Sequence, residues 1–341
     1  MAVKLKDIAA KAGVSSTTCS LILNNKPISV SEETKQNVLR IAQELGYIKK
    51  QEPHNFGLIV PDLGNLYFTE IIKNTSRKAQ EAGYNLVILD SNNNISQEYK
   101  NLLQLRNSKV DGIILALVSR GESINSLQHL IRNMSNDGIP VVLFEDAVSA
   151  FGCHSVCTDG YLGSYLATKH LVELGHTRIG VITGNGEYTE ADTNRTTGYM
   201  AALAEAGIAF DPDLICNGMF TIESGYQYTP VLLKKGCTAI FAHNDMIAFG
   251  VYHYLREHNI RLPEDISLVG FDNIPIISTL ELPLTTVAQP ISQIAERCVD
   301  ILLQSLHSPT TDRISVCMQP ELIIRKSTGP VNPSYSASQR N

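Results

Sequence analysis

The sequence predicts an α/β protein in which a small three-helix unit at the N-terminus precedes one or two larger lobes built on parallel β-sheets. The 341 residues are too many for one ordinary domain. The first 46 residues contain three short helical patterns, each with a start and a stop signal. From Phe56 onward, apolar runs alternate with amphipathic stretches in the βαβα order that is typical of parallel sheets covered by helices.

The charge is distributed unevenly along the chain. The net charge is −6, but residues 1–50 contain eight basic and four acidic side chains, so this segment carries +4 and the rest carries −10. A basic segment attracts phosphate groups, whereas an acidic body is kept away from them. Nucleic acid is therefore a candidate partner of residues 1–50, although an ordinary solvated helical face fits the charge equally well.

Two features of the composition predict a cytoplasmic protein that does not enter a membrane. No stretch approaches the roughly 18 consecutive apolar residues of a membrane span, and the N-terminus lacks the apolar core of a signal peptide. The seven cysteines are odd in number and scattered, without a Cys-x-x-Cys pair. This pattern is typical of reduced thiols and not of a disulfide framework.

Two short helices open the chain. The first is predicted over residues 6–12, where the apolar side chains share one face and Gly13 offers a left-handed stop. Ser15 caps a second helix that continues to Asn24. Because the second helix begins so soon after the first one ends, the two must cross sharply, which is the geometry of a helix-turn-helix.

A third helix completes this small unit. Ser31 is its predicted cap, Glu32 and Glu33 lie at the positive end of its dipole, and Gly46 ends it. We expect its apolar stripe to close the core of the unit, and this stripe consists of Val38, Ile41, Ala42 and Leu45.

The residues of these helices resemble the DNA-binding head of the LacI/GalR family of bacterial transcriptional regulators, which includes the lactose, galactose and purine repressors. The matching strings are Leu5-Lys-Asp-Ile-Ala through Ala12-Gly-Val-Ser to Asn24, then Val30-Ser-Glu-Glu-Thr34, then Glu44-Leu-Gly-Tyr47. The resemblance implies that the second helix lies in the major groove of double-stranded DNA. It assigns base contacts to Ser16, Thr17 and Leu21, and phosphate contacts to Ser15, Thr18, Ser20 and Asn24.

Two residues of the second helix depart from the family pattern. The family often has Arg or His where this chain has Leu21, and a leucine offers only apolar contact, for instance to a thymine methyl group, so a contact with guanine is in doubt. Cys19 stands where the family prefers Val, and we expect it to be a buried small apolar residue. The small polar residues of this helix also fit helix capping and an ordinary surface.

The remainder of the chain is predicted to alternate strands and helices. Strands are predicted over residues 57–60, 85–89, 112–117, 140–144, 179–182, 239–242 and 267–270. The intervening helices include residues 68–82, 97–108, 163–174 and 195–206. This order implies parallel sheets with helices on their faces.

Seven landmarks of the body resemble, in order, the two-lobed periplasmic sugar-binding fold of the same family. They are Gly57-Leu-Ile-Val-Pro-Asp62, Val110-Asp-Gly-Ile-Ile114, Gly175-His-x-Arg-Ile-Gly180, Arg195-x-x-Gly-Tyr199, His243-Asn-Asp245, Gly270-Phe-Asp-Asn273 and Pro320-Glu-Leu-Ile-Ile324. In that fold three segments cross between the lobes, and the ligand lies in the cleft. The resemblance extends to about Gly329 and implies a head over residues 1–47, a linker over 48–55 and a ligand-binding body over 56–330. The composition of residues 331–341 predicts a disordered tail.

Polar residues that follow strands are the candidates for ligand contacts, because open α/β lobes bind ligands beyond the carboxyl ends of their strands. Carboxylates, amides and an arginine suit the vicinal hydroxyls of a sugar. By position in the family's motifs, the contacts are Asp159, Arg195, Asn244 and Asp272, with aromatic cover from Tyr67, Phe68 and Phe220. Asp245 could equally be the N-cap of a helix or a ligand contact, and Phe68 could instead belong to the hydrophobic core.

The identity of the effector stays open. Residues 67–72, and Phe220 with Glu223-Ser-Gly225, look like the purine repressor, whereas Asn244-Asp245-Met-Ile-Ala248 looks like the sugar sensors. The loop over residues 184–194 matches neither. The expected function is that of a ligand-responsive transcriptional repressor whose effector is a sugar or sugar phosphate, with a nucleobase as the alternative.

Two other classes of function fit the sequence less well. No Gly-x-Gly-x-x-Gly, phosphate-binding loop, nucleophile elbow or His-Glu-x-x-His helix occurs, so we expect no catalytic residue and no cofactor. Cys153-His154 with Cys157 lacks the second pair of a metal site and is interpreted as a loop of reduced thiols. A binding protein that delivers its ligand to a membrane transporter would be expected to have a signal peptide and no DNA-binding head, so this class is disfavoured. A cytoplasmic ligand-binding protein with impaired DNA binding is the remaining alternative.

Assembly and the linker complete the expectations. We expect a homodimer on a palindromic operator, because the twofold axis of the protein must match that of the DNA, and the tail has no heptad pattern that could join dimers.

The hinge motif of the family, with its Ala-Arg-x-Leu element, is absent from residues 48–56, and Pro53 would interrupt a helix there. We expect little DNA bending, and unusually salt-sensitive operator binding through phosphate contacts of Lys49 and Lys50.

Overall fold

The computed structural model describes residues 3–24, 26–47, 54–118, 124–145, 151–184, 190–308 and 312–332. The chain forms two compact units, which we call the head (residues 1–53) and the body (residues 54–341). Within the described residues, no helix combines the length and the apolar character that a membrane span requires.

The head contains three helices, α1 (Leu5–Ala12), α2 (Ser16–Leu23) and α3 (Glu32–Glu44). Gly13 ends α1 in the left-handed region at φ 68°, which a glycine adopts without a steric penalty. The oxygen of Ser15 accepts the backbone N–H of Thr18 and so caps α2. The predicted helix-turn-helix geometry and the burial of Cys19 are confirmed, since all three helices close on one core of Ile8, Ala9, Cys19, Ile22, Val38, Ile41 and Ala42.

The body consists of two lobes, each with one six-stranded sheet. Lobe 1 is wholly parallel, in the order β11 (Ser315–Met318), β5 (His154–Thr158), β4 (Val141–Phe144), β3 (Gly112–Ala116), β1 (Asn55–Val60) and β2 (Asn85–Asp90). Lobe 2 has the order β12 (Glu321–Ile323), β10 (Thr285–Ala288), β9 (Ser267–Asp272), β8 (Ala239–Ala242), β6 (Ile179–Thr183) and β7 (Ile215–Asn217), and only β12 is antiparallel.

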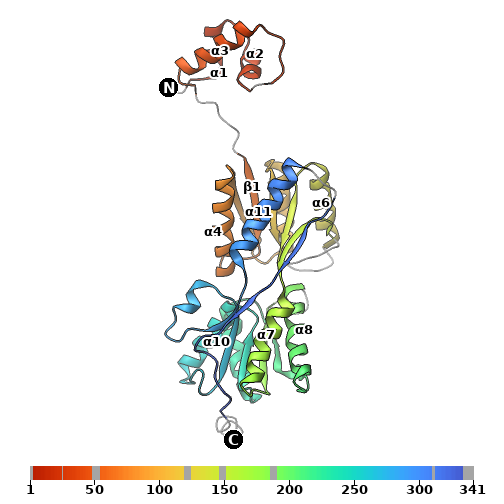
Figure 1. The fold of residues 1–341 in the computed structure, drawn as a ribbon, viewed down its shortest axis with the longest axis vertical. Coiled ribbons are helices and arrows are strands. Elements are labelled where there is room, and N and C mark those ends of the chain that lie inside the picture. Colours follow the sequence, from red (N-terminus) through yellow and green to blue (C-terminus); the bar gives the residue numbers. More distant parts are fainter. Residues whose placement is uncertain are drawn as a thin grey trace. The chain divides into compact units, whose positions relative to one another are not determined.

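Eight α-helices of the described body cover these sheets (Figure 1). They are α4 (Leu66–Glu81), α5 (Ile95–Asn107), α6 (Ile124–Asn136), α7 (Gly160–Glu173), α8 (Glu190–Glu205), α9 (Ile222–Lys234), α10 (Asp245–Glu257) and α11 (Ile291–His307). The central strands β3, β4, β6, β8 and β9 are buried along their whole length, as expected for a parallel sheet with helices on both faces.

Three segments cross between the lobes, as the resemblance implied. β5 of lobe 1 leads into α7, which packs on α8 and on the strands of lobe 2. β10 of lobe 2 leads into α11, which packs against α4 and the lobe 1 strands. The third crossing joins β11 to β12, and Figure 1 shows these segments running between the two sheets.

All seven predicted strands form, but five others were not predicted. The interpretation of residues 153–157 as a loop of thiols is wrong, because His154–Thr158 is strand β5, which pairs with β4 and β11. Its polar composition conceals a strand whose middle residues are buried. Among the described residues, no group of His, Cys, Asp or Glu could hold a metal ion.

Candidate ligand-binding site

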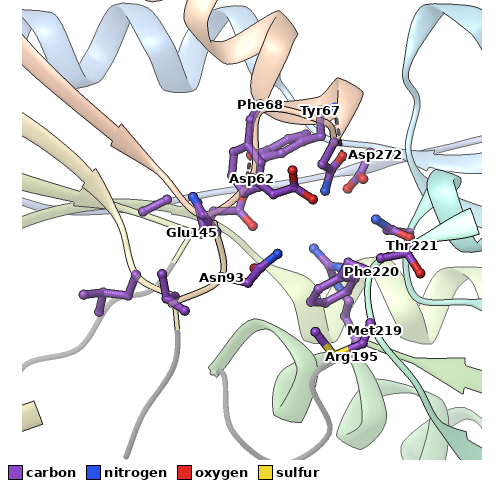
Figure 2. A pocket seen from close by; sticks show the side chains of 16 residues that line it. Asp62, Tyr67, Phe68, Asn93, Glu145, Arg195, Met219, Phe220, Thr221 and Asp272 are labelled. Carbon is purple, nitrogen blue, oxygen red and sulfur yellow. Dashed lines mark hydrogen bonds between the residues drawn. The ribbon is translucent and has the colours of Figure 1, made fainter. Parts of the chain in front are cut away.

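A cavity lies between the two lobes of the body, at the carboxyl ends of their parallel strands. It encloses about 720 Å³, part of which is open to solvent. Side chains from both lobes face one another across it (Figure 2). Lobe 1 contributes Pro61, Asp62, Asn65, Tyr67, Phe68, Asn93, Ala116, Leu117, Val118 and Glu145, and lobe 2 contributes Arg195, Met219, Phe220, Thr221, Asn244 and Asp272.

Arg195 on α8 supplies the only guanidinium among the described lining residues, and it is 4% exposed. Its Cζ lies 4.0 Å from the ring centroid of Phe271 and 5.7 Å from that of Phe220. One terminal nitrogen donates a hydrogen bond to the carbonyl of His243, while Nε has no partner in the described part of the chain. The two rings and the carbonyl fix the plane of the guanidinium, so that its remaining donors are preorganised for a ligand.

Asp272 ends strand β9 with its side chain 3% exposed. Its φ is 113°, a strained value for a residue other than glycine, and such strain is concentrated at functional sites. Gln289 donates a hydrogen bond of 2.8 Å to Oδ1 of Asp272. Burial raises the pKa of this carboxyl well above its usual range, and the nearby Arg195 opposes the rise. A ligand that donates hydrogen bonds to Asp272 would favour its ionised form.

Asn244, a predicted ligand contact, lines the cavity, whereas the interpretation of Asp245 as a helix N-cap is wrong. Asn244, not Asp245, is the N-cap of α10, and its Oδ1 accepts the backbone N–H of Ile247. The Nδ2 of Asn244 is buried at the cavity without a partner among the described residues. An unsatisfied buried amide costs about 1–3 kcal/mol. A ligand atom that accepts a hydrogen bond from Nδ2 would remove this cost and so increase the binding affinity.

Asp245 lies behind the cavity and does not line it. It accepts hydrogen bonds from the backbone N–H of Ile274 at 2.9 Å and from the hydroxyl of Thr286 at 2.7 Å. Burial raises the pKa of Asp245 to about 7. Because Ile274 follows directly on the strained turn at Asp272 and Asn273, Asp245 acts as a support for this turn.

Glu145 was missed by the sequence analysis. It follows strand β4 at a φ of 76° and accepts a hydrogen bond from the hydroxyl of Tyr67. Burial raises the pKa of Glu145, while the Arg195 charge and the Tyr67 hydrogen bond lower it. The same rule that identified Asp272, a polar residue directly after a strand, applies to Glu145 and would have found it.

The predicted aromatic residues all reach the cavity. Tyr67 and Phe68 lie at the start of α4 with ring centroids 5.3 Å apart in an edge-to-face arrangement. Phe68 also packs edge-to-face on Phe144, so it belongs to both the core and the cavity wall. Phe220 precedes α9 and is half-buried at the cavity. Aromatic faces of this kind cover the apolar face of a sugar ring or stack on a base.

Asp159 does not line this cavity. It is the N-cap of α7, and its Oδ1 accepts the backbone N–H of Leu162 at 2.8 Å. A carboxylate in this position satisfies the free N–H groups of the first helical turn. Residues 185–189 of the loop before α8 lie outside the described residues, so the described lining does not include them.

In the head, the seven residues expected to contact DNA all lie on α2 or at its two ends. Ser16 and Thr17 are exposed in the first turn, and Leu21 is half-buried one turn further along. Ser15 caps the helix and is also within 2.9 Å of the hydroxyl of Thr18. At the other end, Asn24 donates to the hydroxyl of Ser20.

The comparisons with known proteins agree with this architecture. Residues 4–50 match the profile of bacterial regulatory proteins of the lacI family, and residues 53–324 match that of periplasmic binding proteins and the sugar binding domain of the LacI family. The transcriptional repressor PurR of Pasteurella multocida is 34% identical, covering 95% of this chain and 98% of PurR.

Two solved structures are similar over most of the chain. A LacI-family regulator from Enterococcus faecium with bound ribose is 28% identical, with a TM-score of 0.74 over 82% of this chain and 100% of that chain. The lac repressor dimer bound to operator and the anti-inducer ONPF is 25% identical, with a TM-score of 0.78 over 96% of this chain and 100% of that chain. The chain therefore belongs to the LacI family of bacterial regulatory proteins and is a transcriptional repressor with a ligand-binding domain of the periplasmic binding protein type.

Proposed function

We propose that this repressor is controlled by a sugar that binds between the lobes, with Tyr67, Phe68, Arg195, Phe220, Asn244 and Asp272 as its contacts. The observation that carries this proposal is the cavity between the lobes, whose lining residues Arg195 and Asn244 each have a buried side-chain nitrogen, Nε and Nδ2, without a partner among the described residues. Buried donors of this kind are normally satisfied. A polyol with several hydroxyls supplies the acceptors for them and the donors for Asp272.

The head binds a palindromic operator as part of a homodimer, which the lac repressor dimer on its operator supports. Ser16 and Thr17 contact bases from the exposed first turn of α2, and Leu21, half-buried one turn further along, contributes an apolar contact. Ser15, Thr18, Ser20 and Asn24 contact phosphates. The protein has no catalytic activity and works in the cytoplasm, where operator DNA is accessible.

The E. faecium regulator with bound ribose supports a sugar as effector, and the similarity to PurR supports the alternative of a nucleobase. A thermal-shift screen of the purified full chain distinguishes them, with neutral sugars, sugar phosphates and nucleobases as separate sets. We expect a sugar to raise the melting temperature and to change operator affinity in a gel-shift assay. A shift with nucleobases alone would contradict the sugar assignment, and a bound sugar that leaves operator affinity unchanged would contradict the regulatory role.

The linker was predicted over residues 48–55, of which residues 48–53 lie outside the described residues and Asn55 is instead the first residue of strand β1. Because the sequence lacks the hinge motif, we predict weak operator binding with a steep salt dependence and little DNA bending. The measurements are operator affinity across salt concentrations and the bend angle from gel phasing. A sharp kink at the operator centre that disappears when the effector is added would show that a differently built linker performs the same function.

A further inference from the structure

The ionisable groups of the cavity are mostly acidic. The described lining includes three carboxyl groups, those of Asp62, Glu145 and Asp272, and a single basic side chain, that of Arg195. Asp62 is partly exposed, and its Oδ1 accepts the backbone N–H of Gly64. Glu145 and Asp272 both interact electrostatically with Arg195. Burial raises the pKa of Glu145 and of Asp272, so a ligand that enters this space meets an excess of negative charge at a pH at which these carboxyl groups are ionised.

Arg195 is poorly placed to offset this excess for an anionic ligand. Its guanidinium lies on the ring of Phe271, and a terminal nitrogen is already bonded to the carbonyl of His243. Its positive charge is shared by two carboxyl groups. A phosphate group binds tightly where several cationic or backbone donors converge on it without neighbouring carboxylates. The described lining supplies one cation, Arg195, and places it near the carboxyl groups of Glu145 and Asp272.

Glu145 is held in position at the centre of this arrangement. Its backbone stands at the end of β4, and the Tyr67 hydroxyl donates to Oε1. A carboxylate accepts several hydrogen bonds, so Glu145 can accept one from a ligand hydroxyl in addition to that from Tyr67. In Figure 2 the Glu145 side chain lies on the lobe 1 side of the cavity, across from Arg195 and Phe220 of lobe 2. A dianionic group that approached Arg195 would come close to Glu145 as well.

We infer that the effector is an uncharged polyhydroxy compound and that Glu145 is a specificity-determining residue that excludes phosphorylated sugars. This inference rests on the proposed sugar-sensing function and narrows it. A hydroxyl group donates a hydrogen bond to the Glu145 carboxylate, whereas a phosphate has no donor to offer and is repelled by it. Because the repulsion acts on the phosphorylated sugar alone, it changes the ratio of the affinities for the neutral sugar and its phosphate more than it changes the affinity for the neutral sugar.

The test uses calorimetry on the full chain with matched pairs: ribose and ribose 5-phosphate, galactose and galactose 6-phosphate, glucose and glucose 6-phosphate. A pH of about 8 keeps the phosphates dianionic and favours ionised carboxyl groups. We expect one neutral sugar to bind at least about tenfold more tightly than its phosphate. In E145Q this ratio should fall by about tenfold or more, because glutamine keeps the acceptor for Tyr67 but loses the charge.

Glu264→Gln is the matched control. Glu264 is exposed in lobe 2 and away from the cavity, so E264Q changes the net charge equally and should leave the ratio unchanged. A sugar phosphate that binds the wild type as tightly as its parent sugar would overturn the inference, and so would an unchanged ratio in E145Q. Failure of the proposed function is a different outcome, in which neither member of any sugar pair binds while hypoxanthine or guanine does.

Discussion

Replacing Arg195 with alanine is expected to weaken effector binding about 100-fold while operator affinity stays close to that of the wild type. The guanidinium is 4% exposed and fixed between Phe220 and Phe271, so its free donors are aimed at the ligand. Loss of two charge-assisted hydrogen bonds costs roughly 3 kcal/mol, which corresponds to this factor. Calorimetry with the sugar found in the screen measures the loss, and a gel-shift assay without effector measures operator binding.

Asp272→Ala should have a similar effect, because Asp272 is 3% exposed and lines the same cavity. Arg132→Ala is the control, since Arg132 is exposed on α6 and does not line the cavity. Melting curves show whether each variant is folded. Effector affinity that is unchanged in both R195A and D272A would refute the assignment of the cavity as the effector site.

The head could be predicted almost completely from the sequence because its signals are local. Ser15 and Ser31 cap helices within their own segments, and Gly13 ends a helix through its own backbone conformation. The apolar stripe of α3 packs on the single small core that the three helices form, so no distant part of the chain is needed to explain its burial. Helix ends differ from the prediction by one or two residues, which is the usual uncertainty at helix termini.

The body was predictable where burial produces a simple pattern and not elsewhere. Strands such as β3, β4 and β8 are continuous apolar runs, and their ends were predicted closely. The missed strands β5 and β11 are mixed in composition, and they pair with each other across about 160 residues of chain. Their pairing depends on how the chain crosses between lobes, and no short window of sequence contains that information.

The candidate site was predictable to the extent that its residues follow strands. Asp272 and Asn244 were found in this way, although they come from different strands, because parallel strands place their carboxyl ends at one edge. Asp159 also follows a strand, yet the nearby start of α7 engages its carboxylate as a cap. Whether a residue that caps a helix also lines the cavity, as Asn244 does and Asp159 does not, depends on the position of the helix, which only the fold determines.

Lobe 2 depends on two glycines at which helices α9 and α10 approach closely. A Cβ at Gly225 would lie 2.0 Å from the carbonyl oxygen of Ile247 on α10, and a Cβ at Gly250 would lie 1.9 Å from that of Ile222 on α9. The obstacles are backbone atoms, which cannot rotate away as a side chain would. The two contacts are reciprocal, so each glycine accommodates the backbone of the opposite helix.

Gly250→Ala is therefore expected to destabilise the protein by about 3 kcal/mol or more, although alanine favours a helix over glycine by about 1 kcal/mol. The helices must separate to admit the methyl group, and apolar contacts between them would be lost along their length. Differential scanning calorimetry of the full chain measures the fall in melting temperature. Gly207→Ala is the matched control, because Gly207 has a φ of 69° and a Cβ added there would meet no described atom within 4 Å, so that only the left-handed backbone, at about 1–2 kcal/mol, opposes the substitution. If G250A melts no lower than G207A, the close approach of α9 and α10 does not limit the stability of lobe 2.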